Sequence, residues 1–447
     1  MSSAKAISPV QSPMRRVLSN FLLLARGRVV AALMLFGVTA LLARVLGPVE
    51  FGMIVLIETY ALLTRGLLNF KLFDAIVRFG VPAYDAKDTR TLRRLIQICW
   101  RLDLITTASG AIIAILLAPV VGPHMGMDSN HVFFLTLYSF VIFASIGNGT
   151  SRGLLRLFDK FDIIGKQMSV GPLVRFVGVC IAWWFDASFA VFISILAIGS
   201  ISEDLYLNFY GWREYRKKIG PAENSQDTHN MRVDEFTGLR HFIWVTYWQA
   251  NVDMVPKRIT VMLAGYLLGA SEAGLLRLAR QFSSLLSQPA ALIRQVVFLD
   301  LTRSWNQGSS DFKVVAYRTA MLGALFGLVF VVVALFFGEA LLQLTVGQEY
   351  IAAAPVLALL LFASTLDLTA SSLRSASYAI GHAGLVLRVY TLSALLYLVM
   401  FFALTSFFSL IGAGIAACVG AAIPPMVMLN LIHKSILTIP VVKKKSK

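Results

Sequence analysis

Long apolar runs follow one another along almost the whole chain, and short polar stretches separate them. Twelve of these runs reach the length of a membrane span, at residues 28–46, 51–73, 94–121, 132–157, 163–184, 187–211, 242–268, 272–300, 314–345, 351–380, 384–408 and 411–435. A hydrocarbon layer of ~30 Å takes about 20 apolar residues in a helix. The runs are continuous and do not alternate as barrel strands do, so helices are what satisfies their backbone in lipid. The pattern predicts an all-α polytopic membrane protein with about twelve transmembrane helices.

Composition excludes a soluble globular protein. Of the 447 residues, 57% are hydrophobic and only 14% are charged, and the mean hydropathy is +0.73. Soluble domains carry about 25% charged residues. A net charge of +16 would suit a nucleic-acid partner, and its placement along the chain decides whether that partner is expected.

Lys and Arg alternate between the connections that join the predicted spans. All but eight of the 40 Lys and Arg residues lie in the two tails or in every second connection, within 71–94, 152–166, 212–240, 294–318 and 374–388. The connections at 122–131, 185–187, 269–271, 338–350 and 409–411 contain none. This distribution follows the positive-inside rule, which predicts that both termini are cytoplasmic. The charge then lies beside anionic lipid headgroups, and we expect no nucleic-acid partner.

The chain divides into two similar halves. Residues 41–52 read LLARVLGPVEFG and residues 263–274 read LAGYLLGASEAG, and each stretch joins the first two spans of its half. The predicted organisation is a cytoplasmic or interfacial N-terminal segment (1–27), an N-lobe of six helices (28–212), a cytoplasmic linker (213–241), a C-lobe of six helices (242–436) and a basic cytoplasmic tail (437–447). Transporters built from such repeats bind substrate between the halves.

Eight cations remain inside the predicted spans or at their ends: Arg44, Arg65, Arg101, Arg175, Lys257, Arg258, Arg277 and Arg280. A cation at a helix centre costs roughly 2.5–3.5 kcal/mol on insertion scales, so eight facing lipid would cost on the order of 20 kcal/mol. Some must therefore reach an interface, and others must face a polar cavity. We interpret Arg101 as interfacial. The other seven are candidate ligands of an anionic substrate, because the planar guanidinium fork fits phosphate.

Two features of these cations leave alternatives open. Arg44 either anchors the first span or lines its outer mouth. Arg277 and Arg280 are three residues apart, so they share a helix face and could face a cavity together.

Acidic residues within the spans are fewer than the cations. Asp74, Asp253 and Asp367 are candidates for coupling transport to a proton or sodium ion. Asp253 precedes Lys257 by four residues, and Asp74 precedes Arg78 by four, so each spacing also predicts an ion pair within one helix.

Aromatic residues open the seventh span, at Trp244, Tyr247 and Trp248. Aromatic side chains at the end of a span usually form an interfacial belt. Stacking against sugar rings is the alternative interpretation.

The sequence contains no pattern that indicates enzymatic chemistry. Motifs for nucleotide binding, zinc proteases and serine hydrolases are missing from the sequence. The predicted outer connections are also too short to hold a catalytic domain. We therefore expect no catalytic residues, cofactor or metal, and we interpret the three cysteines as small apolar-region residues: Cys99, Cys180 and Cys418.

The stretch ARVLGPVEFG at 43–52, followed by an apolar span and LFDAIVRFGVPA at 72–83, resembles the Wzx-type O-antigen and exopolysaccharide flippases. These belong to the MATE/MOP exporter superfamily. The resemblance extends over most of the chain through the span number, the two halves and the basic middle loop. It implies a V-shaped bundle of two six-helix lobes around a cationic cavity, in the bacterial inner membrane.

The resemblance also implies a cargo and partners. The cargo would be an undecaprenyl-pyrophosphate-linked oligosaccharide repeat unit, moved by alternating access from the cytoplasmic to the periplasmic leaflet. Such units build O-antigen lipopolysaccharide, exopolysaccharide or capsule. The implied partners are this lipid-linked oligosaccharide, membrane lipids, and polysaccharide polymerase or chain-length machinery.

Several departures from the pattern narrow the cargo. By position, Arg65 is similar to a cavity arginine of the peptidoglycan-precursor flippases. Unlike those relatives, this chain has no Arg within 29–43 and no Asp directly after the corner. It also has fewer spans, so a polysaccharide repeat unit is favoured over lipid II.

Two alternative functions stay open. A cation-coupled multidrug exporter of the same fold is one, and the excess of Arg over acids counts against it. A membrane-bound polysaccharide polymerase is the other, and the short outer loops count against that.

Overall fold

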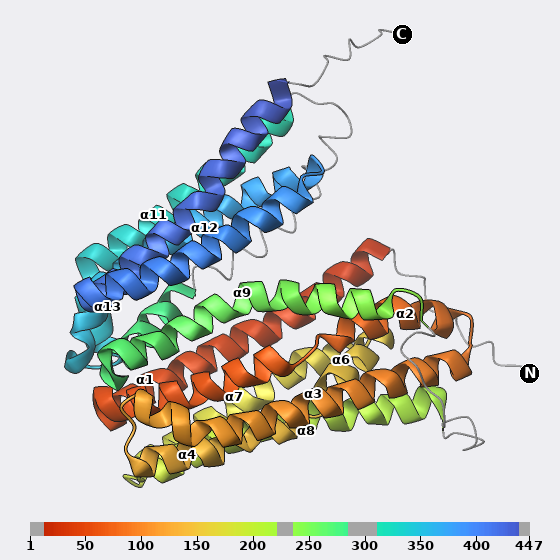
Figure 1. Ribbon diagram of the computed structural model, residues 1–447, viewed down its shortest axis with the longest axis horizontal. Helices are drawn as coiled ribbons and strands as arrows, with labels where there is room; N and C mark the ends of the chain where they lie inside the picture. Colours follow the sequence, from red (N-terminus) through yellow and green to blue (C-terminus); the bar gives the residue numbers. More distant parts are fainter. Residues whose placement is uncertain (1–12, 221–235, 285–310, 438–447) are drawn as a thin grey trace, which may run out of the picture. The chain divides into compact units, whose positions relative to one another are not determined.

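Helices make up all the regular structure in the part of the chain that the structure describes. A computed structural model describes residues 13–220, 236–284 and 311–437, and no strand occurs among them (Figure 1). Eleven of the twelve apolar runs fall largely on helix, and the eighth is helical over its described residues, 272–284. The prediction of an all-α polytopic membrane protein is confirmed.

Seven helical segments of the described ranges are long and apolar enough to cross a membrane. Two of them, Gly27–Asp85 and Gly384–His433, each cover two predicted spans. The predicted spans at 163–184, 242–268 and 272–300 are not among the seven. These three contain most of the leftover cations, because Arg175, Lys257, Arg258, Arg277 and Arg280 lie on them.

Helix α1 (Pro13–Leu68) contains the first two predicted spans and breaks at Gly47, where φ is 71° and ψ is 174°. Glycine adopts a positive φ without steric cost, and the following Pro48 suits the first position of a new helix. A straight helix of this length would measure about 84 Å, far more than the ~30 Å of hydrocarbon. Gly269, at the matching position of the second half, has a positive φ of 100° as well.

The first compact unit consists of residues 1–41, 64–117 and 134–250. After α1 it contains all or part of these helices: α2 (Leu72–Asp85), α3 (Thr89–His124), α4 (Ser129–Ser139), α5 (Val141–Ala144), α6 (Asn148–Leu157), α7 (Phe161–Trp184), α8 (Phe189–Ile219) and α9 (Leu239–Leu268). Helix α7 packs along α8, and α6 packs against both α2 and α8. Leu72, Ile76, Leu95 and Leu154 are fully buried in the apolar core between these helices.

The fourth predicted span is divided into α4, α5 and α6, and Gly147 with a φ of 83° precedes α6. Because α6 begins inside a membrane-length segment, its first N–H groups need partners from the protein. Asp103 of α3 supplies one: its Oδ2 accepts hydrogen bonds from the backbone N–H of Thr150 at 3.0 Å and from the Thr150 hydroxyl at 3.4 Å. The helix dipole further stabilises a carboxylate at this end.

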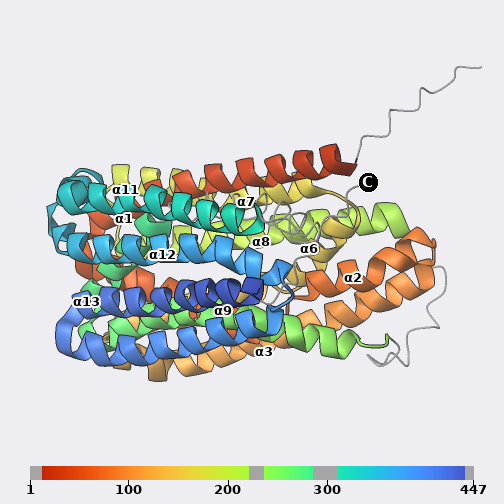
Figure 2. The ribbon, with the colours of Figure 1, turned by 90° about the horizontal axis from the view of Figure 1, so that it is seen from above.

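The second compact unit consists of residues 42–63, 118–133 and 251–447. It includes the middle of α1, the end of α3, the start of α4, most of α9 and residues 270–284, which are helical. It also contains α11 (Asp311–Thr345), the 3-10 helix η3 (Gln348–Ala353), α12 (Ala354–Ala379) and α13 (Ala383–Leu437). Helix α12 packs against both α11 and α13, and the three run side by side in Figures 1 and 2. Helix α13 merges the last two predicted spans and breaks at Phe408 and Ser409.

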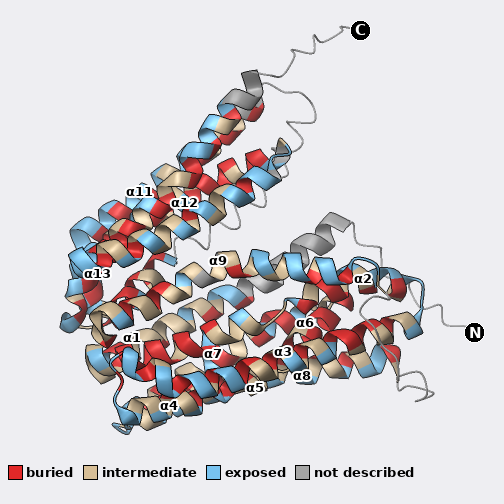
Figure 3. Ribbon diagram, viewed as in Figure 1, coloured by how far each residue is buried: buried red, intermediate tan, exposed pale blue. Residues whose placement is uncertain are grey.

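The second unit exposes large apolar side chains. Figure 3 shows buried and exposed positions mixed along α11, α12 and α13. Phe336 on α11 is 79% exposed and Phe407 on α13 is 83% exposed. Exposed apolar surface of this kind indicates contact with lipid, since soluble monomers rarely carry it.

The two related corners lie against each other in the second unit. A Cβ atom added at Gly52 would lie 1.9 Å from the carbonyl oxygen of Ala270, and one added at Gly274 would lie 3.2 Å from the Cα of Gly52. The glycines that the two halves share at this position therefore allow close helix contact. The lobe boundaries at 28–212 and 242–436 stay a prediction.

Candidate functional site

The first unit contains a buried ion pair at membrane depth. Arg65 on α1 donates from both terminal nitrogens to Asp204 on α8, at 3.1 and 3.0 Å. Asn148, the first residue of α6, donates to Oδ1 of the same carboxylate at 2.5 Å. The Asp204 side chain is 5% exposed, whereas that of Arg65 is 28% exposed. The bidentate geometry is the arrangement in which guanidinium binds carboxylate or phosphate most strongly.

Further charged groups surround this pair. Gln167 on α7 donates to Oε1 of Glu203 at 2.6 Å, and Arg152 on α6 lies 3.5 Å from the oxygen of Gln167. The charges of Arg65, Arg152 and Arg175 all act on Glu203. Arg175 on α7 donates to the Ser200 hydroxyl at 2.5 Å. We call this set the Asp204 cluster, and it consists of Arg65, Asn148, Arg152, Gln167, Arg175, Glu203 and Asp204.

The Asp204 cluster holds three guanidinium groups against two carboxyl groups. Among the described residues, the buried Nε of Arg152 has no hydrogen-bond partner, so this donor is unused. A buried, unused donor next to excess positive charge is an arrangement that an additional anion would satisfy.

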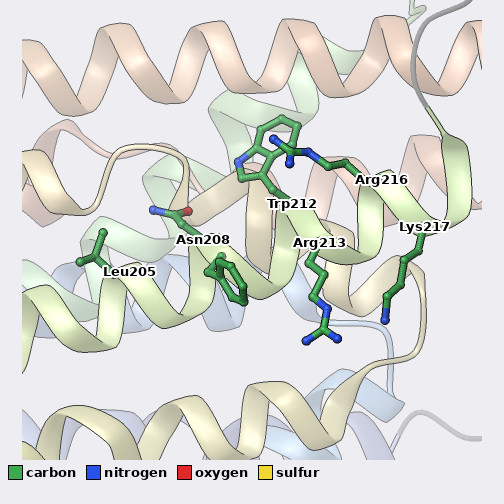
Figure 4. Close-up of a pocket in the computed structure, with 7 residues that line it drawn as sticks. Leu205, Asn208, Trp212, Arg213, Arg216 and Lys217 are labelled. Atoms are coloured by element: carbon green, nitrogen blue, oxygen red, sulfur yellow. The ribbon is translucent and has the colours of Figure 1, made fainter.

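A groove of about 870 Å³ runs along α8 (Figure 4). Asn208 and Trp212, which follow Asp204 at intervals of four residues, lie in it and so share a helix face with that carboxylate. Toward the end of the helix the lining becomes cationic. The complete lining is Leu205, Asn208, Phe209, Trp212, Arg213, Arg216 and Lys217.

Three predicted cations of the second unit lie on or contact α9, and Arg280 joins this helix to α13. This guanidinium donates to the backbone carbonyl of Lys257 on α9 and to the Tyr397 hydroxyl on α13. Tyr397 in turn lies 3.5 Å from the hydroxyl of Thr260. Arg258 donates to the backbone carbonyl of Leu62. We call this set the Arg280 cluster, and it consists of Lys257, Arg258, Thr260, Arg280 and Tyr397.

The remaining predicted residues of this unit have different surroundings. Arg277, one turn before Arg280, is exposed. Asp367 on α12 is close enough to Lys257 and Arg374 for their charges to act on it. Asp253 lies in α9, and its side chain is outside what the structure describes.

Arg44 has a structural role that the sequence left open. Its guanidinium donates to the carbonyl oxygen of Leu344, in the last turn of α11. Carbonyl groups at a helix C-terminus lack partners within the helix, and a cation there also complements the dipole. The observed contact is therefore an anchoring one.

The predicted ion pair between Asp74 and Arg78 is wrong. Asp74 instead accepts a hydrogen bond at 3.3 Å from Arg156 on α6, which is 82 residues away. Arg78 lies over the rings of Phe79 and Phe242, 4.6 Å from the centre of the latter. Packing of α2 against α6 brought a partner from another helix within reach, and this overrode the local spacing.

The aromatic residues at the start of α9 form a cluster with Phe70. The ring centres of Phe70 and Tyr247 are 4.6 Å apart, and the Tyr247 hydroxyl donates to the carbonyl of Leu67 at 2.6 Å. Trp244 and Trp248 stack and are 45% and 60% exposed. Both the interfacial belt and the sugar-stacking interpretation are compatible with this geometry.

A small polar group joins the predicted outer ends of two helical segments. His131 lies between Glu50, at 3.1 Å, and Asp128, at 2.5 Å. The hydrogen bonds from the backbone N–H and the ring of His131 lower the pKa of Asp128 below its ordinary value. Glu50 of the first corner is therefore linked to the connection between α3 and α4.

Sequence reasoning missed four charged residues of the first unit. Asp103, Glu203 and Asp204 lie within predicted spans, so a search for acids inside apolar runs would have found them. Arg152 was assigned to a cytoplasmic connection, and only the start of α6 at residue 148 places it beside the Asp204 cluster. The three cysteines are free thiols, and Cys99 is buried.

Comparisons with known proteins agree with this architecture. The family described as "Polysaccharide biosynthesis protein" matches residues 17–298. Inner membrane protein YghQ of Escherichia coli (strain K12) is 25% identical over 353 residues, which cover 76% of this chain and 95% of YghQ.

Solved structures show the same fold. The lipid II flippase MurJ in an inward closed conformation has a TM-score of 0.71 at 14% identity, covering 95% of this chain and 89% of MurJ. An inward-facing multidrug resistance MATE family transporter of the MOP superfamily has a TM-score of 0.67 at 13% identity, covering 93% of this chain and 96% of that transporter.

The fold is thus a polytopic helical membrane fold that the chain shares with these solved structures. Within this class, the chain belongs to the polysaccharide biosynthesis protein family. The resemblance based on residues 43–52 and 72–83 is confirmed.

Proposed function

We propose that the protein moves an undecaprenyl-pyrophosphate-linked oligosaccharide from the cytoplasmic to the periplasmic leaflet of the bacterial inner membrane. The observation that carries the proposal is the excess of cations over acids in the Asp204 cluster, where three guanidinium groups accompany two carboxyl groups. In the second unit, Lys257 lies near Asp367, and Arg258 and Arg280 donate to the backbone carbonyl groups of Leu62 and Lys257. Such sites suit a phosphorylated cargo, because Arg binds phosphate through its planar fork.

The groove on α8 supports a cargo that is both anionic and lipidic. Phe209 and Trp212 offer apolar surface next to Arg213, Arg216 and Lys217. A pyrophosphate headgroup with an isoprenoid tail likewise places a charged group next to an apolar one.

The membrane potential can supply part of the driving force. A pyrophosphate headgroup carries about two negative charges, and each gains roughly 2.3 kcal/mol per 100 mV on leaving a negative interior. Two charges therefore gain roughly 5 kcal/mol. Coupling to an ion through Asp74, Asp253 or Asp367 is not required for net export on this basis.

Flipping in proteoliposomes tests the proposal. The purified protein is reconstituted with a fluorescent undecaprenyl-pyrophosphate oligosaccharide, and a potassium diffusion potential is imposed. We expect flipping that speeds up when the compartment holding the substrate is negative. Arg65→Gln and Arg280→Gln should each slow it at least tenfold, whereas Arg101→Gln, which changes an exposed cation, should not. No flipping by the wild type, or equal loss in all three variants, would refute the proposal.

The alternative functions predict other outcomes. A multidrug exporter that carries cations would favour an acidic or neutral cavity, and both clusters contain more cations than acids. Drug resistance conferred on a pump-deficient host would support that alternative. Normal flipping with unpolymerised single units in a deletion strain would support a polymerase.

The proposed orientation places both termini in the cytoplasm, and reporter fusions at each end test it. Polysaccharide polymerase and chain-length proteins are the proposed partners, and co-purification from membranes tests that association.

A further inference from the structure

In the structure, a carboxylate occupies the binding position of Arg65. Both terminal nitrogens of this guanidinium are directed at the two oxygens of Asp204. Carboxylate and phosphate oxygens use the same fork in the same geometry. An incoming phosphate can therefore take this position only by displacing Asp204.

The position of the pair along α8 makes such an exchange possible. Asp204 lies nine residues before Arg213, which corresponds to about 13 Å along the helix from the cationic end of the groove. Asn208, one turn from Asp204, lines that groove. The Arg65 side chain is 28% exposed, while that of Asp204 is 5% exposed and is held by Asn148.

The charges around the pair set how tightly a cargo is held. Three guanidinium groups accompany Glu203 and Asp204, so the formal charges of the five side chains sum to one positive. A pyrophosphate with about two negative charges would reverse this sign. A carrier must bind its cargo firmly enough to take it up and weakly enough to release it. A permanent carboxylate beside Arg65 keeps the affinity for the cargo low enough for release.

We propose that Asp204 is an internal competitor of the cargo phosphate for Arg65, and that exchange between the two anions permits both uptake and release. This inference rests on the proposed function and adds a role for a residue outside the predicted site. Asp204 thereby acts through Arg65 and is a positioning residue. Asp204 therefore lowers the affinity for the cargo phosphate and speeds its release.

Binding of inorganic pyrophosphate to the purified protein in nanodiscs, measured by calorimetry at fixed ionic strength, tests the competition. Hydrogen bonds to charged groups contribute about 1.5–3 kcal/mol, so Asp204→Asn should tighten binding roughly tenfold to hundredfold. The gain should disappear in the double variant Arg65→Gln/Asp204→Asn, whose affinity should equal that of Arg65→Gln.

Asp103→Asn is the matched control. It removes a buried acid of the same unit that bonds to Thr150 and not to an arginine. It should leave pyrophosphate affinity within twofold of the wild type. An equal gain in this variant would attribute the effect to general loss of negative charge and overturn the proposal.

A second variant carries the test if Asp204→Asn does not fold. Asn148→Ala removes the contact that holds Asp204 beside Arg65, and it should tighten binding several-fold. Unchanged or weaker binding in a folded Asp204→Asn or Asn148→Ala protein overturns the proposal, as does a gain that persists without Arg65.

Flipping assays separate this inference from the proposed function. The wild type should flip the lipid-linked oligosaccharide, and Asp204→Asn should bind it more tightly yet turn over more slowly. If the wild type flips and no variant changes the affinity, only the competition fails. If the wild type does not flip, the proposed function fails, while the pyrophosphate measurements still decide the competition.

Discussion

The substitution Gly52→Ala tests whether the two related corners must touch. The new Cβ would lie 1.9 Å from the carbonyl oxygen of Ala270, 2.4 Å from its carbon and 3.1 Å from the backbone nitrogen of Ser271. Ordinary contacts of this kind begin near 3.4 Å, so the helix backbone at 270–284 would have to move by more than 1 Å.

The energetic cost follows from two opposing effects. Alanine within a helix is favoured over glycine by about 1 kcal/mol. Overpacking that moves backbone costs typically 1–3 kcal/mol, and sometimes more. Since backbone atoms cannot rotate away as a flexible side chain does, we expect a net destabilisation of roughly 2 kcal/mol.

Two further glycines calibrate the measurement. At Gly274 the new Cβ would lie 3.1 Å from a carbon of the Phe51 ring, and at Gly384 it would have no atom within 4 Å. The fraction of protein that stays monodisperse after heating in detergent should rank Gly384→Ala at or above the wild type, Gly274→Ala below it and Gly52→Ala lowest. If Gly52→Ala is as stable as Gly384→Ala, the corners do not pack as described.

Three other substitutions probe the polar contacts and the aromatic cluster. Asp103→Ala leaves buried donors of α6 without an acceptor, so it should cost about 1–3 kcal/mol and speed hydrogen exchange at the start of that helix; unchanged exchange would contradict the cap. Tyr397→Phe removes the hydroxyl that accepts from Arg280, and we expect a loss of about 1.5–3 kcal/mol in thermal stability measurements; a stability equal to the wild type would show that this contact contributes nothing. Trp248→Ala and Trp184→Ala change exposed aromatic residues at span ends, and as interfacial residues both should keep flipping within twofold; a selective loss with Trp248→Ala would favour sugar stacking.

The repeated corner was the feature most fully predicted by sequence. Gly47 and Gly269 both take a positive φ, and the two corners join the helices where the pattern expects them. A turn between two membrane-length helices depends on the local backbone conformation. Gly permits a positive φ there, and Pro suits the first position of the next helix, so both can be identified from the sequence. What the pattern could not predict is that Gly52 and Gly274 pack together, because this depends on how helices far apart in the sequence pack within the second unit.

The candidate site was predicted less well. Arg65, Arg175 and Arg280 were identified because a cation in an apolar run is costly wherever it points. Their partners come from other helices, and Asp204 lies 139 residues from Arg65. Spacing along one helix predicted a partner four residues from Asp74, and the structure instead provides Arg156.

By itself, then, the sequence determined the helical class and the repeated corner at Gly47 and Gly269. The physical reason is that both features are local. The length of each apolar run matches the thickness of the hydrocarbon layer, and the turn residues set the backbone conformation between two runs. Only the tertiary structure decided which charges neutralise which, that Arg44 binds the end of α11, and that Arg152 joins the Asp204 cluster. Those outcomes depend on distances between helices far apart in sequence, where a few ångströms decide between an ion pair and an unused donor.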